Sequence, residues 1–226
     1  MNDTNCTVVV VDDDPSIRRS VARLIRSAGI NVTTFASPVQ FLRQELPEGP
    51  ACVLLDMCME GMTGLEVQEA LGRNDRHVPI VFLTAHGTVP TAATGFKHGA
   101  ADFLEKPFSP DALLDAIHSA IAQDRARCNE RAVLGAFRRR YDLLTPREQE
   151  VMALVVSGQL NKQAAADLGI SEKTIKVHRA RVMEKMEVES LAELVLIAQR
   201  LGVASAPAPT QTAEGDFAET WPGHSR

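Results

Sequence analysis

The stretch that decides the fold is Ala51-Cys-Val-Leu-Leu-Asp56, a short apolar run that ends on a carboxylate. A second apolar run, Thr7–Val11, is followed by three consecutive acids, Asp12, Asp13 and Asp14. Short apolar runs predict buried strands. The carboxyl ends of parallel strands lie along one edge of a sheet, where open α/β folds place their sites. The sequence therefore predicts that these carboxylates gather at one edge.

Two further apolar runs end on a hydroxyl and on an ammonium group, which would lie at the same edge of the sheet as the carboxylates. Residues 80–83 stop on Thr84, and residues 102–104 run into Glu105 and Lys106. Clustered acids beside one hydroxyl and one ammonium suit a divalent cation and a phosphoryl group.

Residues 7–122 alternate strand-like and helix-like patterns. Apolar residues recur at helical spacing between the strands, and residues 89–98 are predicted to form one of these helices. The alternation predicts an α/β fold: a (βα)5 doubly wound domain over residues 1–122, with a five-stranded parallel sheet covered by helices on both faces.

The rest of the chain is helical in pattern up to residue 202. Residues 123–143 are basic, with apolar residues at helical spacing, and predict a helical linker; a solvated helix and a dimer or interdomain contact both fit. Thr145-Pro-Arg-Glu148 has the form of a capping box. It opens a small all-α domain of four helices over residues 144–202. Residues 203–226 have few large apolar side chains and predict a disordered tail.

The composition fits a soluble, cytoplasmic protein. The chain has 226 residues, 45% hydrophobic content and a net charge of -5, which argues against a general binder of polyanions. The four cysteines show no CxxC spacing, so we expect reduced thiols. No apolar run approaches the roughly 18 residues of a membrane span.

The acids, taken with Lys106 and Thr84, predict a magnesium and phosphoryl site. Mg²⁺ prefers oxygen ligands and keeps several waters. Asp13 and Asp56 could each supply one oxygen and the main-chain carbonyl of Cys58 a third, with Asp12 acting mainly through water. Lys106 and the Thr84 hydroxyl would neutralise and hydrogen-bond a phosphoryl group. The Asp56 carboxylate is itself a reasonable nucleophile for forming an acyl phosphate.

Residues 7–122 resemble the receiver domain of two-component response regulators. The resemblance is carried by five motifs in order: Val11-Asp12-Asp13, Leu55-Asp56, Met62-Thr-Gly64, Thr84-Ala85 and Phe103-Leu-Glu-Lys106-Pro107. It implies phosphorylation of Asp56 by a sensor histidine kinase, Mg²⁺ as cofactor, and a cis peptide bond before Pro107.

The resemblance also implies a switch. Thr84 would move toward the phosphoryl group and Phe103 would swing inward behind it; the alternative is that Phe103 is an ordinary core residue. In the family, the face that carries residues 89–98 and Phe103 pairs with a second copy of the chain. Val89, Phe96 and Phe103 are therefore the expected dimer contacts of this domain.

The sequence departs from the receiver pattern at three positions. Glu60 replaces a common proline, Cys58 cannot orient water through a polar side chain, and His86 follows Thr84 closely. We expect these differences to affect the lifetime of the phosphoryl group rather than the identity of Asp56.

Residues 144–202 resemble the LuxR-type helix-turn-helix domain, in its NarL/FixJ branch. The run Asn161-Lys-Gln-Ala-Ala-Ala-Asp-Leu-Gly-Ile-Ser-Glu-Lys-Thr-Ile-Lys-Val-His-Arg carries the match, and the whole of residues 1–202 resembles a FixJ-like regulator. Between Lys173 and Lys185 there are five cations and one anion, which favours DNA. Lys176 and Val177 are expected in the major groove, with Lys173 or Arg181 beside them. The other predicted contacts, at the starts of the two helices, are expected on phosphates. The predicted DNA contacts are Asn161, Lys162, Ser171, Lys173, Thr174, Lys176, Val177 and Arg181.

A single reading helix covers few base pairs, so we expect a homodimer on paired half-sites of promoter DNA. Leu191 and Leu194 are the expected dimer contacts of this domain, although some residues of their helix must be core. RNA polymerase is a further candidate partner.

The sequence therefore predicts a phosphorylation-activated transcription regulator and not an enzyme. Two alternatives remain open at this point. One is a magnesium-dependent phosphohydrolase of the aspartyl-phosphate type, which turnover of a small phosphate ester would support. The other is a constitutive DNA-binding protein with a vestigial receiver, which a phosphate-insensitive dimer would support.

Overall fold

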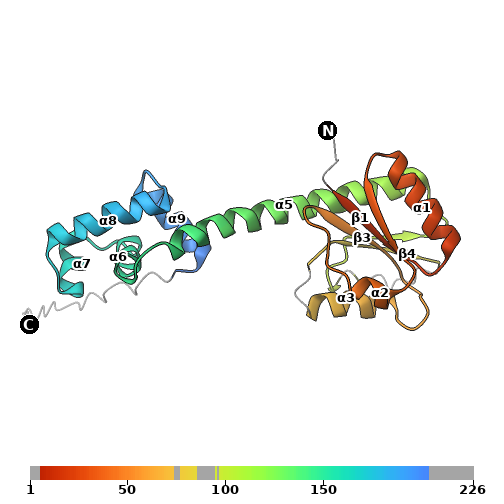
Figure 1. Cartoon of the computed structure of the whole chain (residues 1–226), viewed down its shortest axis with the longest axis horizontal. Coiled ribbons are helices and arrows are strands. Elements are labelled where there is room, and N and C mark those ends of the chain that lie inside the picture. Colours follow the sequence, from red (N-terminus) through yellow and green to blue (C-terminus); the bar gives the residue numbers. More distant parts are fainter. Residues whose placement is uncertain (1–5, 74–76, 86–94, 96, 204–226) are drawn as a thin grey trace, which may run out of the picture. The chain divides into compact units, whose positions relative to one another are not determined.

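The computed structural model describes residues 6–73, 77–85, 95 and 97–203. It divides into two compact units, Met1–Ala132 and Val133–Arg226, and Figure 1 shows the elements of each. Each unit is described separately below. The predictions for His86, Val89, Phe96 and residues 204–226 lie outside the described residues.

The first unit is built on a five-stranded sheet, as predicted. All strand pairs are parallel, and the order is β2-β1-β3-β4-β5. In this register Val11 lies beside Leu55, and Asp56 beside Leu83, so the carboxyl ends of β1, β3 and β4 lie level. The strands are β1 (Thr7–Val11), β2 (Asn31–Phe35), β3 (Ala51–Asp56), β4 (Ile80–Thr84) and β5 (Asp102–Glu105).

Helices cover both faces of this sheet (Figure 1). On one face, α1 (Pro15–Ser27) and α5 (Pro110–Asp142) pack on alternate strand residues such as Val10 and Leu54. On the other face, α2 (Pro38–Leu42) and α3 (Gly64–Arg73) pack on the intervening residues, such as Leu55. The apolar runs are buried on both sides, as expected for parallel strands.

The turn from β1 into α1 is fixed by Asp14. Its carboxylate accepts the amide hydrogens of Ser16 (2.7 Å) and Ile17 (3.3 Å), and Pro15 occupies the first turn, where a missing N–H costs nothing. Asp14 therefore serves the helix start, whereas Asp12 and Asp13 are left at the strand end.

The helix α5 is one continuous element of 33 residues that runs through residues 123–142. Leu113, Ile117 and Ile121 pack on the sheet. Beyond them Asp124, which is 4% exposed, accepts the amide hydrogen of Ala51 at the start of β3 over 2.9 Å. The first compact unit thus extends past residue 122 to Ala132.

The second unit is helical. It contains α6 (Pro146–Val156), α7 (Asn161–Leu168), α8 (Glu172–Met186) and α9 (Leu191–Leu201), together with the end of α5. The capping box is present, with Thr145 and Glu148 each bonding the other's amide. Gly169 ends α7 at a φ of 64°, a left-handed conformation that glycine adopts without strain.

Within the described residues, no helix is both long enough and apolar enough to cross a membrane.

Candidate functional site

The carboxylates of Asp12, Asp13 and Asp56 converge at the carboxyl edge of the sheet, as the strand ends predict. They offer oxygen atoms that all lie within 4.8 Å of one another. Asp12 is 0% and Asp56 7% exposed, while Asp13 is exposed. Three acids at this spacing repel one another, so the site favours a cation.

Lys106 lies between two of these acids. Its Nζ donates to Oδ2 of Asp12 over 2.8 Å and to Oδ1 of Asp56 over 2.9 Å. Its amide donates to the Thr84 carbonyl over 2.7 Å, which ties this segment to the end of β4. The peptide bond between Lys106 and Pro107 is cis, as the resemblance implies. One ammonium thus ties the ends of β1 and β3 to the segment after β5.

Burial and pairing act in opposite directions on these groups. Burial raises the pKa of the Asp56 carboxyl, while the hydrogen bond and charge of Lys106 lower it; burial prevails. Burial alone would lower the pKa of the Lys106 ammonium, but its bonds to Asp12 and Asp56 outweigh this and raise it. Lys106 is therefore a permanent cation at neutral pH.

Arg18 also supports the site, through a contact that the sequence does not predict. Its Nη1 donates to the main-chain carbonyl of Asp12 over 2.6 Å, and the amide of Asp14 donates to Oδ1 of Asp12 over 2.8 Å. The loop after β1 is thereby held from two sides. Helical spacing places Arg18 one turn inside α1, but a bond to a main-chain oxygen leaves no sequence pattern.

Thr84 and Phe103, predicted to form the switch, occupy adjacent strands. Thr84 is 5% exposed at the end of β4. The half-buried Phe103 ring packs on Phe82, with ring centroids 4.9 Å apart. A β-carbon on Gly95 would come within 2.3 Å of Phe103 Cζ, so this ring fills the space over Gly95.

The acidic site fits a magnesium ion. Asp12 uses Oδ2 for Lys106 and Oδ1 for the Asp14 amide. Within the described residues no hydrogen bond reaches Oδ1 of Asp13 or Oδ2 of Asp56, and both are hard oxygen donors of the kind Mg²⁺ prefers. Cys58, whose carbonyl was predicted as a third ligand, follows Asp56 closely and has an exposed side chain.

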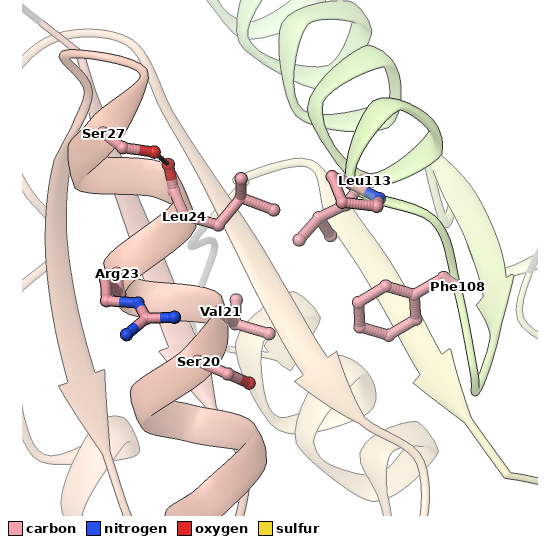
Figure 2. A pocket seen from close by; sticks show the side chains of 8 residues that line it. Ser20, Val21, Arg23, Leu24, Ser27, Phe108 and Leu113 are labelled. Carbon is pink, nitrogen blue, oxygen red and sulfur yellow. Dashed lines mark hydrogen bonds between the residues drawn. The ribbon is translucent and has the colours of Figure 1, made fainter.

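A groove opens between α1 and the start of α5 (Figure 2). Its volume is about 540 Å³, and Val21, Leu24, Phe108 and Leu113 face it. Arg23 also lines it. Phe108 is two residues past Lys106, so the groove adjoins the acidic site along the chain.

In the second unit, α7 and α8 form a helix-turn-helix. Lys173, Lys176, Val177 and Arg181 follow at helical spacing and are exposed; Val177 has an exposed fraction of 46% although it is apolar. Ile175, Val182 and Met186 on the other side of α8 are buried in the core. The predicted reading face is therefore the free face of α8.

The remaining predicted DNA contacts lie at the starts of α7 and α8. Ser171 caps α8 by accepting the Thr174 amide hydrogen over 3.1 Å, and the two hydroxyls lie 2.8 Å apart. Lys162 is exposed, whereas the half-buried Asn161 accepts a bond from Arg179 (3.3 Å). Asn161 and Arg179 thus link the two helices.

Lys185, counted with the cations of α8, has a structural partner. Its Nζ donates to Oε2 of Glu148 over 2.6 Å and to the Leu143 carbonyl over 3.1 Å. Glu148 is 2% exposed. Lys185 therefore stabilises the start of α6 rather than adding to the reading face.

The helix α9, predicted to form a dimer face, is buried on one side and exposed on the other. Leu194 is 0% exposed and belongs to the core of its own unit. Leu191 is 36% and Leu196 60% exposed, so both leucines add apolar surface to the exposed side of α9. Leu196 cannot be distinguished from its neighbours in the sequence, because apolar residues occupy most positions of this helix.

Comparisons with known proteins agree with this architecture. Residues 8–118 match the model of the response regulator receiver domain, and residues 142–198 match that of bacterial regulatory proteins of the luxR family. Nodulation protein W of Bradyrhizobium diazoefficiens is 42% identical over 202 residues, which is 89% of each chain. The transcriptional regulatory protein FixJ of Azorhizobium caulinodans is 39% identical and is covered over 97% of its length, by 91% of this chain.

Solved structures give the same result. The response regulator StyR superposes with a TM-score of 0.78 at 44% identity, over 87% of this chain and 99% of StyR. Full-length FixJ from B. japonicum gives a TM-score of 0.51 at 39% identity, over 87% of this chain and 97% of that one.

A receiver domain joined to a LuxR-type DNA-binding domain defines a two-component transcriptional regulator. This chain belongs to the NarL/FixJ family of response regulators.

Proposed function

We propose that this regulator is activated when a sensor histidine kinase transfers a phosphoryl group to Asp56, and that it then binds promoter DNA as a dimer in the cytoplasm. One observation carries the proposal: a single ammonium, that of Lys106, bonds both Asp12 and Asp56. A phosphoryl group on Asp56 would offer Lys106 a more highly charged partner and draw it from its present position.

Asp56 is suited to act as the nucleophile. Its Oδ1 is held by Lys106, which orients the carboxylate, while Oδ2, which accepts no bond from the described residues, would attack phosphorus. Asp13, Asp56 and the Cys58 carbonyl would hold Mg²⁺, and Asp12 would act mainly through water. When bound, the metal shields the incoming phosphoryl charge.

If Lys106 moved away from Asp12, the main chain before and after Lys106 would be affected. Its amide is bonded to the Thr84 carbonyl, and Phe103 lies three residues earlier on β5. Movement of the Thr84 hydroxyl toward the phosphoryl group and of Phe103 in its packing against Phe82 would alter the β4–β5 surface. Phe103, Val89 and Phe96 are the proposed contacts of a receiver dimer.

The kinase is proposed to dock on the groove between α1 and α5. The groove adjoins Lys106 through Phe108 and offers apolar side chains beside Arg23. A partner seated there would lie next to the edge that carries Asp56. The donor of the phosphoryl group must approach that edge.

The output is proposed to be sequence-specific DNA binding by α8. Lys176 and Val177 would contact base edges, with Lys173 or Arg181 beside them. Ser171, Thr174, Asn161 and Lys162 would contact phosphates. Leu191 and Leu196 on α9 would pair two copies, which could then contact RNA polymerase.

The deciding experiment is sedimentation equilibrium with Mg²⁺ alone and then with beryllium fluoride, a phosphoryl mimic. We expect the wild type to form dimers only with the mimic and Asp56→Ala to remain monomeric. Asp115→Ala, which removes an exposed acid on α5, is the matched control and should behave as the wild type. A mass that ignores the mimic, or an Asp56→Ala chain that responds to it, contradicts the proposal.

A further inference from the structure

A buried amide side chain joins α3 to the turn that leads into β5. Gln68, on α3, is 6% exposed. Its Nε2 donates to the carbonyl of Gly95 over 3.4 Å and to the carbonyl of His98 over 3.2 Å. Burial of a polar side chain is unfavourable unless its groups find partners, so these two bonds offset part of the cost of burying Gln68.

The turn that Gln68 contacts has the form of a helix end. The Gly95 carbonyl also accepts the amide hydrogens of His98 (3.2 Å) and Ala100 (2.9 Å), and Gly99 has a φ of 87°, in the left-handed region that is common just after a helix. The last carbonyls of a helix have no partner within it. Gln68 supplies a donor for two such carbonyls from another element.

Gly95 also contacts Phe103, the residue predicted to move in the switch. A β-carbon on Gly95 would fall 2.3 Å from Cζ of Phe103, so the ring lies directly over Gly95. Gln68 holds the carbonyl of the same glycine. Movement of the Phe103 ring would therefore change the surroundings of a group that Gln68 binds.

The contact made by Gln68 is only marginally favourable. Its bond lengths, 3.4 and 3.2 Å, are at or beyond the upper end of the usual N–H···O range. The other amide atom of Gln68, Oε1, is buried and accepts no hydrogen bond in the described part of the chain. A buried acceptor without a donor is unfavourable, so a small displacement of the turn would be enough to break the contact.

We propose that Gln68 is a latch that favours the unphosphorylated conformation: its amide holds the turn at Gly95 and His98, and the turn is released when Phe103 moves. This inference rests on the proposed activation through Asp56. A contact that is present in only one of two conformations shifts the equilibrium toward that conformation. The latch therefore weakens the apparent binding of a phosphoryl mimic, because the released conformation is the one that binds it well.

The variant Gln68→Met removes the latch with little other change. Methionine is unbranched and of similar length, but it has neither a donor for the two carbonyls nor an oxygen that needs a donor. Loss of the unpaired oxygen offsets part of the cost of losing the donors, so the variant should fold. Gln123→Met makes the same exchange at an exposed position of α5 and is the matched control.

The test is a titration of the ¹⁵N-labelled full-length chain with beryllium fluoride at saturating Mg²⁺, with the midpoint read from the amide resonances of residues 57–59. We expect Gln68→Met to bind the mimic about tenfold more tightly than the wild type, the effect of losing two neutral hydrogen bonds. Gln123→Met should match the wild type. Equal midpoints for the three chains, or weaker binding by Gln68→Met, overturn the latch.

A second readout needs no substitution. The side-chain NH₂ of Gln68 is buried and hydrogen-bonded, so its protons should exchange slowly with solvent in the free chain and faster once the mimic is bound. Unchanged exchange in a wild-type chain that binds the mimic overturns the latch alone. A wild-type chain that does not bind the mimic overturns the proposed phosphorylation of Asp56, and this inference with it.

Discussion

The ring of Phe103 occupies the space where a side chain on Gly95 would lie: a β-carbon there would fall 2.3 Å from Cζ of Phe103. The same added atom would fall 3.2 Å from the Phe82 ring. Glycine at position 95 is therefore what permits Phe103 to pack against Phe82 in this conformation.

The variant Gly95→Ala should displace Phe103 and destabilise the receiver. We expect the free energy of unfolding to fall by about 1–3 kcal/mol, the usual cost of overpacking a core. Urea titration of the full chain measures this. Gly72→Ala in α3 is the control: no atom of the described residues lies within 4 Å of its added β-carbon, so the free energy of unfolding should rise by about 0.5–1 kcal/mol. Equal effects of the two variants would contradict the packing argument.

The variant Asp124→Ala should loosen α5 from the sheet. The buried amide of Ala51 and the thiol of Cys128 both donate to Asp124 Oδ2, and loss of the acceptor leaves a buried N–H unpaired at a cost of about 2 kcal/mol. Calorimetry should show a lower melting temperature, and hydrogen exchange at Ala51 should accelerate. Asp115→Ala, at an exposed position of the same helix, should change neither.

The second unit should lose stability in acid through Glu148. Hydrogen bonds from Lys185 and from the Thr145 amide lower the pKa of this carboxyl from 4.5 to about 2. A folded pKa below the unfolded one contributes stability that is fully present above pH 4.5 and is lost as the pH falls toward 2.

Glu148→Gln should remove the part of the acid dependence that comes from Glu148. It should also lower the free energy of unfolding by about 2 kcal/mol at neutral pH, because the charge of Lys185 loses its partner. The measurement is the melting temperature of the second unit between pH 7 and pH 2.5. Glu150→Gln, whose carboxylate forms an exposed pair with Arg147, is the control. A melting curve of Glu148→Gln that still follows the wild type in acid would contradict the assignment.

Lys162 should contribute one phosphate contact on DNA. Removal of one such contact lowers the slope of log affinity against log salt concentration by about 0.9. We therefore expect Lys162→Ala to weaken binding to specific and random duplexes alike, with a shallower slope in fluorescence anisotropy. Arg43→Ala removes an exposed cation from the receiver instead and should keep the wild-type slope. A Lys162→Ala slope equal to that of Arg43→Ala would place Lys162 off the DNA.

The positions of Asp12, Asp56 and Lys106 could be predicted because each lies at the carboxyl end of a strand of a parallel sheet: Asp12 follows β1, Asp56 ends β3 and Lys106 follows β5. The register brings those ends level. The bond from the Glu60 amide to Asp13 could not be predicted, because a main-chain donor is present at every residue and only the loop conformation selects one. Leu194 and Leu196 show a second limit of prediction from the sequence. Both are apolar positions of α9, and only the packing shows that the first is core and the second surface.

The shared ammonium of Lys106 has a consequence for the charge balance of the acidic edge. Three carboxylates and one ammonium leave two negative charges uncompensated, and one divalent cation cancels them. An acyl phosphate at Asp56 adds about one negative charge to that neutral set, which neither the cation nor Lys106 can offset alone. Binding linkage is reciprocal, so the phosphorylated chain should hold its cation more tightly than the unphosphorylated one. Depletion of free magnesium would then favour the unphosphorylated chain over the phosphorylated one, without any change in the kinase.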